Sequence, residues 1–292
     1  STLSSSSAAS DVYKRQPYDD PLTNDPQNTP LRIQRGQTYI AMEAYPLAIA
    51  DFNVALAAAD ADETRAAASL GRGVSRFHTR EWSAALQDLD QALALDPTLA
   101  DAHAWRGHLL AERREYTAAI EALRQAVALD AGDPVKHIRL AWALLGSGDP
   151  AQAVREYSAA LDLATSVEAY TGRALAYAEL GDVEAVQTNL SHAMSTAPFD
   201  PIALNGRALI LARYQPEHLF EAEQLARQAV KNARSDLERA GCLYTLAWIQ
   251  YQRGWYNETI ATLEEAAALA TVEGQVVYRE IMALLEQANA AQ

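Results

Sequence analysis

The chain has 292 residues, with 38 Asp or Glu against 24 Lys or Arg, which gives a formal net charge of −14. Phosphate backbones and anionic lipid surfaces repel a chain of this charge, so we expect no nucleic-acid partner. No run of about eighteen apolar residues is present, so we also expect no insertion into a membrane. The sequence contains no phosphate loop, dinucleotide fingerprint, HExxH or CxxC motif, and it therefore predicts no enzyme, no cofactor and no metal site.

The beginning of the chain differs in character from the rest. Residues 6–16 read SSAASDVYKRQ, which resembles the translation of a sequencing adapter, so we interpret residues 1–16 as a non-native tail. Residues 17–30 carry four prolines among Asp, Asn and Thr, and this composition predicts a flexible leader over residues 17–28. If the tail is an adapter, the natural amino terminus and any signal peptide or lipid anchor are missing. The sequence therefore does not identify the cellular compartment, and it favours the cytoplasm only slightly.

From residue 29 onward one motif recurs at a spacing of about 34 residues. Its clearest copies are AYPLAIADFNVAL (44–56), EWSAALQDLDQAL (81–93), EYTAAIEALRQAV (115–127) and WYNETIATLEEAA (255–267). Each unit reads as a helix A, a short turn and a helix B, with a small residue wherever two helix backbones must approach. The small residues of helix A are Gly36, Gly73, Gly107, Ala141, Ala174, Ala208 and Ala247. Those of helix B are Ala55, Ala92, Ala126, Ala160, Ala193, Ala229 and Ala266.

The segment LDPTLADAHAWRGHLLAERREYTAAIEALRQAVALD (95–130) holds most of this pattern, and it resembles the tetratricopeptide repeat family. The resemblance implies an all-α fold, an α-solenoid of about seven helix-turn-helix repeats that forms a right-handed superhelix. We expect the repeats in residues 29–273, and their starts near residues 29, 66, 100, 134, 167, 201 and 240. Residues 274–292 alternate apolar and charged positions at helical spacing, which predicts a C-terminal capping helix.

The glycine and proline residues between the helices agree with this interpretation. Gly148, Gly181 and Gly254 fall in the turns between helix A and helix B, where a left-handed residue is needed. Pro97 and Pro198 are expected to follow the end of a helix B. The turn of the sixth unit (213–222) is two residues longer than the others and contains a proline, so the pattern does not fix its geometry.

Five units place an arginine directly before the small residue of helix A. These are Arg35, Arg72, Arg106, Arg173 and Arg207. One interpretation is a ladder that binds anions. The other is structural, because an arginine between two helices needs a carboxylate partner, and Asp51 and Asp88 stand at the right register. We therefore predict that Arg35 pairs with Asp51 and that Arg72 pairs with Asp88.

Members of the family generally bind proteins or peptides through the concave face lined by helix A, so the resemblance implies such a partner here. Helical spacing places a largely apolar set of residues on this face. They are Ile33, Gln37, Val74, Phe77, His78, His108, Glu112, Ile138, Trp142, Leu175, Asn205, Leu209, Tyr244, Trp248 and Tyr251. Ile33 and Gln37 stand where chaperone-binding members carry lysine and asparagine, which argues against a carboxylate clamp.

We interpret the chain as a monomeric, non-catalytic scaffold whose groove binds an apolar or amphipathic peptide segment. Two alternatives stay open. In the first alternative, the chain is an accessory or regulatory domain of a larger, truncated enzyme or of a secretion or assembly complex. In the second, it is a metal-dependent enzyme. The second alternative rests on His108 and Glu112, four residues apart on one helix, with His78 one repeat earlier. We interpret these three residues as polar groups on the wall of the groove and not as a metal site. We interpret His103 and His137 as imidazoles packed between helices.

Overall fold

The computed structural model describes Leu22, residues 25–270 and residues 276–291. Residues 1–16 and most of the expected leader lie outside the described residues, so the interpretation of the tail stays a prediction. The chain divides into two compact units. Unit 1 contains residues 1–109 together with 122–130, and unit 2 contains residues 110–121 together with 131–292.

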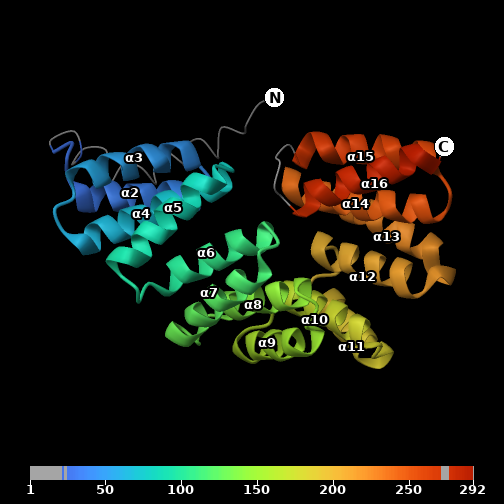
Figure 1. The fold of residues 1–292 in the computed structure, drawn as a ribbon. Coiled ribbons are helices and arrows are strands. Elements are labelled where there is room, and N and C mark those ends of the chain that lie inside the picture. The colour runs from blue at the N-terminus through green and yellow to red at the C-terminus, as the bar shows by residue number, and fades with distance from the viewer. Residues whose placement is uncertain (1–21, 23–24, 271–275, 292) are drawn as a thin grey trace. The chain divides into compact units, whose positions relative to one another are not determined.

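Unit 1 consists of consecutive helices that follow the repeat motif (Figure 1). The helices α2 (Thr29–Ala41) and α3 (Tyr45–Ala58) form the first pair, and α4 (Asp62–His78) and α5 (Trp82–Leu95) form the second. The next two helices, α6 (Ala100–Glu112) and α7 (Tyr116–Leu129), have residues in both units, because the end of each that adjoins their common turn belongs to unit 2.

Unit 2 continues with four pairs and one further helix. In chain order the elements are α8 (Pro134–Gly146), α9 (Pro150–Leu163), α10 (Val167–Leu180), α11 (Val183–Thr196), α12 (Pro201–Tyr214), the short 3-10 helix η1 (Pro216–His218), α13 (Leu219–Asn232), α14 (Asp236–Gln252), α15 (Tyr256–Ala270) and α16 (Val276–Ala291). Over the described residues the fold is therefore all-α, with seven helix pairs, a final helix and no strand, as expected. The right-handed superhelix stays a prediction.

Two helices begin about one turn before the motif does. Helices α4 and α14 have 17 residues each, and their first turns carry Asp62 and Glu63, and Asp236 and Glu238, respectively. Acidic side chains interact favourably with the positive end of the helix dipole, which helps extend both helices toward the preceding loop. Helices α2, α8–α12 and α14 begin with an Asp, Asn or Ser whose side chain accepts a backbone hydrogen bond, as Asp182 does from Ala185 N at 3.0 Å.

The turns between helix A and helix B use a left-handed residue. Gly148, Gly181 and Gly254 have φ angles of 87°, 76° and 77°, as the sequence predicts. The longer turn of the sixth pair, whose geometry the sequence left open, instead forms η1 before α13 begins. Pro97 and Pro198 lie just beyond the ends of α5 and α11, also as expected.

Three of these turns reach the left-handed conformation without glycine. Glu43, Arg80 and Arg114 have φ angles of 56°, 68° and 61°. A side chain in this conformation costs about 1–2 kcal/mol, because Cβ crowds the following carbonyl oxygen. The backbone of the first three turns is therefore more strained than that of the glycine turns that follow them.

The small residues lie where helices touch. All seven predicted alanines of helix B have no exposed surface. Large and small side chains compensate between successive pairs, because a Cβ atom on Gly71 would overlap the ring of Phe52, and one on Gly172 would overlap the ring of Tyr157. An aromatic residue on helix B thus fills the space left by a glycine on the following helix A.

The junction between α11 and α12 departs from this rule. Gly206 has the register of Gly71 and Gly172, but α11 supplies Leu190 where α3 and α9 supply an aromatic residue. Gly206 is approached by Thr171 of α10 instead, and α11 packs less closely on α12 than α9 packs on α10. A cavity of about 590 Å³ is left, lined by Leu190 and Ile210 among others.

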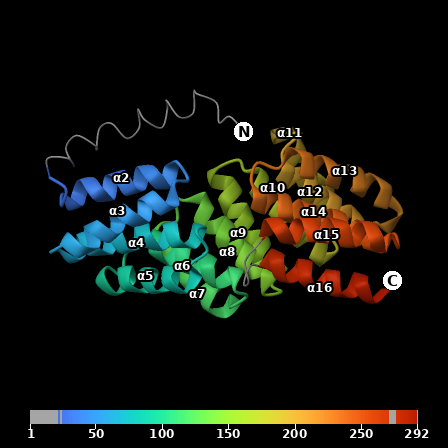
Figure 2. The same ribbon diagram turned by 90° about the horizontal axis from the view of Figure 1, so that it is seen from above.

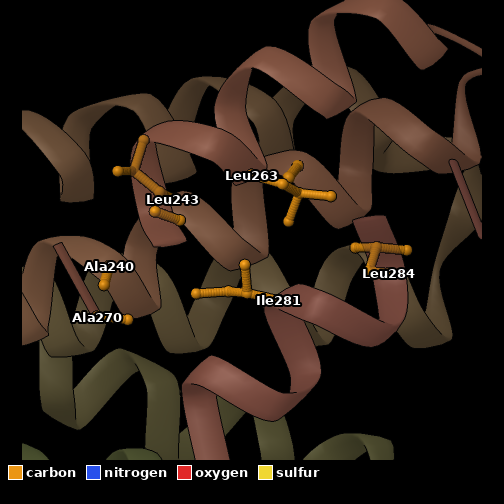
Figure 3. Close-up of a cluster of buried hydrophobic side chains, with 8 residues drawn as sticks. Ala240, Leu243, Leu263, Ala270, Ile281 and Leu284 are labelled. Atoms are coloured by element: carbon orange, nitrogen blue, oxygen red, sulfur yellow. The ribbon is translucent and has the colours of Figure 1, made fainter. Parts of the chain in front are cut away.

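Helix α16 covers the end of the last pair, as predicted for a capping helix. It runs beside α15 (Figure 2), and its Ile281 and Leu284 enter a buried cluster with Leu243 and Leu263 (Figure 3). Burial of each such side chain contributes about 1.5–3 kcal/mol. Among the helices of the described ranges, none has the combined length and apolar character needed to cross a bilayer.

Candidate functional site

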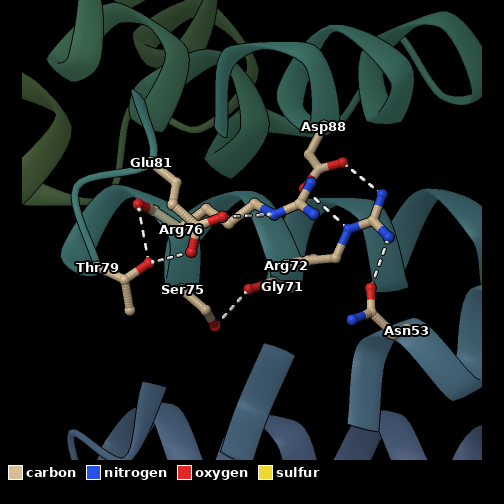
Figure 4. A network of polar contacts seen from close by, with 8 residues as sticks. All are labelled: Asn53, Gly71, Arg72, Ser75, Arg76, Thr79, Glu81 and Asp88. Atoms are coloured by element: carbon tan, nitrogen blue, oxygen red, sulfur yellow. Dashed lines mark hydrogen bonds and ion pairs between the residues drawn. The ribbon is translucent and has the colours of Figure 1, made fainter. Parts of the chain in front are cut away.

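The five predicted arginines are all engaged by side chains of the protein. Arg35 donates two hydrogen bonds to Asp51, at 2.7 and 2.8 Å, and Arg72 donates two to Asp88, at 2.9 and 2.6 Å, so both predicted pairs are confirmed. Each of these carboxylates is 2% exposed and receives a second guanidinium, from Arg32 and Arg76 respectively. Figure 4 shows Arg72 and Arg76 converging on Asp88.

The other three arginines find different partners. Arg106 binds Asp90 of the preceding α5 at 2.7 Å, and Arg207 binds Glu221 of α13 at 2.6 Å. Arg173 donates to the amide oxygen of Asn189 at 2.8 Å and to Ser158 at 2.9 Å. The structural interpretation of the arginines is thus supported over a ladder that binds anions.

In unit 1 three of the six predicted groove residues lie in an aromatic cluster. We define this cluster as Tyr45, Phe77, His78, Trp105 and His108. The His78 ring stacks on Tyr45 at 4.4 Å between centroids, and the Phe77 ring lies 5.3 Å from Trp105 and 5.0 Å from His108. Ile33 and Val74, by contrast, are buried in the packing of the helices, at 9% and 7% exposure, and Gln37 is exposed outside the cluster.

The histidines make ring contacts and hydrogen bonds within the protein. No group of three or more His, Cys, Asp or Glu in the described part of the chain could hold a metal ion. His103 Nε2 lies 3.0 Å from Pro97 O, while His137 places its two ring nitrogens 2.7 Å from Glu156 and 3.3 Å from Ala131 O. Glu112 belongs to unit 2, where the pKa of Tyr116 is raised by burial and, to a smaller extent, by the charges of Glu280 and Glu112.

In unit 2 the predicted residues form what we call the helix A face of unit 2, namely Ile138, Trp142, Leu175, Asn205, Leu209, Tyr244, Trp248 and Tyr251. Ile138 is buried at 6% exposure, and the others keep part of their surface accessible. Trp248 packs against the apolar clusters on both sides of α14, and Tyr251 lies edge-on to Tyr256 at 5.5 Å. The Oδ1 atom of Asn205 is buried, and no described residue donates to it.

The structure brings Tyr244 and Trp248 together in one cavity, which we call the α14–α16 pocket. Its volume is about 510 Å³, and its lining comprises Arg114, Tyr244, Trp248, Glu280, Ala283, Leu284 and Gln287. Arg114 Nη2 donates to Glu280 Oε1 at 2.8 Å across 166 positions of sequence. Burial raises the pKa of Glu280, although the charge of Arg114 acts in the opposite direction. Burial and the Glu280 charge raise the pKa of Tyr244 to about 12, so the phenol stays neutral.

Comparison with family models decides the classification. Two tetratricopeptide repeat models match the chain, one over residues 79–134 and the other over residues 110–171. The chain contains tetratricopeptide repeats over residues 79–171. Its fold is thus that of an α-solenoid whose repeats serve in protein–protein interaction. A comparison with curated protein sequences gives no match.

Solved structures of other proteins share the fold. A repeat protein from Parabacteroides merdae has 15% identity and a TM-score of 0.71, with 90% of this chain and 99% of the other covered. YrrB, described as having an unusual peptide-binding site, has 19% identity and a TM-score of 0.52, covering 66% and 98%. Yeast Tom70 has 16% identity and a TM-score of 0.58, covering 87% of this chain and 60% of Tom70.

Some residues of the tetratricopeptide repeat surface could not be predicted from the sequence. Trp105 joins the aromatic cluster from the register of Gly71 and Gly172, where a large side chain is not the rule. Tyr45 was not among the predicted groove residues, yet it stacks on His78. Arg114 and Glu280 reach the α14–α16 pocket from a turn and from the final helix, and no repeat register connects them. Only the three-dimensional arrangement reveals that pair.

Proposed function

We propose that this protein is a non-catalytic scaffold that binds an apolar or amphipathic peptide segment of a partner protein on the helix A face of unit 2. The single observation that carries the proposal is the α14–α16 pocket, where two predicted groove residues, Tyr244 and Trp248, line a cavity of about 510 Å³. Pockets of roughly 300–1,000 Å³ with aromatic walls and a few polar groups are typical of ligand sites.

The chemistry of the face supports a peptide as its ligand. Trp142, Leu175 and Leu209 remain partly accessible although their neighbours on the same helices are buried. Large apolar side chains with a polar rim are the usual anchors for an amphipathic helix or an extended peptide. YrrB, which shares the fold, is described as having a peptide-binding site, so a framework of these repeats can carry such a site.

The expected affinity is modest. A peptide that becomes ordered on one groove loses conformational entropy, and this loss offsets part of the burial energy. We therefore expect dissociation constants of about 1 μM, equivalent to about −8 kcal/mol. Salt should change the affinity of uncharged peptides little, because their binding depends on apolar burial.

The test is selection from a displayed library of random peptides, followed by fluorescence anisotropy with the selected sequences. We expect Trp248→Ala and Trp142→Ala to weaken binding about tenfold or more, since buried Trp side chains are frequent hot spots. Trp255→Ala is the matched control, because Trp255 lies in the turn before α15 and stacks on Arg253 at 3.7 Å, outside the helix A face. If both groove variants keep a native circular dichroism spectrum and bind like the parent protein, the helix A face is not the binding surface.

A further inference from the structure

We propose that the α14–α16 pocket accepts an arginine or lysine side chain of the bound segment, and that Arg114 occupies this position in the free protein. The proposal rests on the function proposed above and adds the chemistry of the partner. The segment would be amphipathic and basic, with its cation directed between Tyr244, Trp248 and Glu280.

The lining of the pocket has the composition of a cation site. Tyr244 and Trp248 supply two aromatic walls, Glu280 supplies a carboxylate, and Gln287 supplies an amide. Aromatic faces attract guanidinium and ammonium groups, and a carboxylate binds them through charge-assisted hydrogen bonds. Ala283 and Leu284 complete the wall with apolar surface, which suits the methylene stem of a long basic side chain.

Arg114 already shows how a guanidinium binds there. Its Nη2 atom donates to Glu280 Oε1 at 2.8 Å, although the two residues lie in a turn and in the final helix. Their side chains are 43% and 37% exposed, and an ion pair this accessible contributes only about 0–1 kcal/mol. Arg114 can therefore move into solvent at small cost when another cation takes its place.

The charges around the pocket favour a cation over an anion as the ligand. Glu280 is the one carboxylate among the lining residues, and its partner Arg114 is an exposed side chain that another cation can replace. The nearby Arg213 is engaged by Glu179 at 3.3 Å. An acidic segment would meet Glu280 and a chain of net charge −14, whereas a basic segment would be attracted by both.

The experiment uses two synthetic amphipathic helices of roughly four turns that differ at one central residue. One peptide carries arginine at this position and the other carries citrulline, which has nearly the same shape without the charge. We expect the intact protein to bind the arginine peptide about tenfold more tightly, because the bound peptide covers the pocket and its cation contacts two aromatic rings as well as Glu280. Arg114→Gln should tighten binding of the arginine peptide about threefold or more, because the competing guanidinium is gone.

Glu280→Gln should remove the preference for arginine over citrulline. The matched control is Glu221→Gln, which breaks the Arg207–Glu221 ion pair of 2.6 Å and comparable exposure elsewhere in unit 2 and should leave both affinities unchanged. Circular dichroism confirms that each variant is folded. Equal affinity of the intact protein for the two peptides would overturn the cation site while leaving the proposed function intact. Failure of both peptides to bind would count against the proposed function and this inference together.

Discussion

Arg72 and Asp88 join α4 to α5 through two parallel hydrogen bonds of 2.9 and 2.6 Å, and Asp88 is 2% exposed. A buried carboxylate that holds two guanidinium groups cannot be neutralised without leaving those groups uncompensated. We predict that Asp88→Asn lowers the free energy of unfolding by about 3 kcal/mol. Asp90→Asn is the control on the same helix, because the Arg106–Asp90 pair is exposed and should contribute less than about 1 kcal/mol. Urea denaturation of both variants measures the difference, and equal losses would contradict the role of burial.

The cavity between α11 and α12 predicts a stabilising substitution. Leu190→Tyr introduces at this junction the aromatic residue that faces a glycine elsewhere, as Tyr157 faces Gly172. Filling the space should raise the free energy of unfolding by about 1 kcal/mol. Leu89→Tyr is the matched control, because its following helix presents Trp105 in place of glycine, and overpacking there should cost about 1–3 kcal/mol. Thermal unfolding of the two variants should therefore shift in opposite directions.

The turn residues predict effects of opposite sign at equivalent positions. Glu43→Gly should stabilise the protein by about 0.5–1 kcal/mol, since glycine relieves the φ of 56° at some cost in chain entropy. Gly181→Ala should destabilise it by about 1 kcal/mol, although a Cβ there would meet no atom within 4 Å. Denaturation midpoints check both values. If Gly181→Ala were neutral, backbone conformation would not be the reason for glycine in these turns.

The raised pKa of Glu280 makes the effect of Glu280→Gln depend on pH. Burial is the main cause, so between the unfolded pKa of the group and its folded pKa the folded state binds more protons than the unfolded state. The contribution of Glu280 to stability is therefore greatest below the unfolded pKa and decreases as pH rises through the folded pKa. We therefore expect the free energy of unfolding of Glu280→Gln, taken relative to that of the parent protein, to increase as pH rises through this range. Urea titrations at several pH values measure it, and a difference independent of pH would argue against a raised pKa for this half-buried carboxyl group.

Cys242, the single cysteine, should report unfolding of unit 2. Its side chain is buried, and burial with the charges of Glu238 and Asp200 raises the pKa of the thiol to about 12. Thiolate is the reactive form, so alkylation of the folded protein near pH 8 should be about a thousandfold slower than alkylation in denaturant. Mass spectrometry of a labelling time course provides the rates. Rapid labelling without denaturant would show that α14 opens readily.

Much of the fold could be predicted because the repeat imposes local rules. The helix pairs follow from periodic small residues, and the Arg35–Asp51 pair follows from register and the need to compensate a buried charge. The partner of Arg106 could not be predicted in this way, because α7 has Ala122 at the register that Asp88 occupies in α5. Arg106 instead binds Asp90 on the preceding helix. A register identifies a position but not the partner that a long side chain selects.

The candidate site was harder to predict than the fold. Sequence periodicity indicated Tyr244 and Trp248 as neighbours one helical turn apart, and the structure places both in the α14–α16 pocket. Their companions Arg114 and Glu280 come from elements separated by several repeats, so local rules do not relate them. Ile33, Ile138 and Val74 were assigned to the groove by the same periodicity, yet they are mostly buried in the packing of the helices. Helical spacing alone does not separate the accessible edge of a helix from its buried edge.

The loose contact between α11 and α12 also bears on how the protein unfolds. In repeat arrays each unit is stabilised mainly by its immediate neighbours, so a weak interface limits how far the stability of one unit protects the next. Amide hydrogen exchange should therefore show a step at this junction, with α12–α16 opening as one cooperative segment and α8–α11 as another. Leu190 and Gly206 would then mark a boundary between two folding segments inside unit 2, set by the volume of a single side chain.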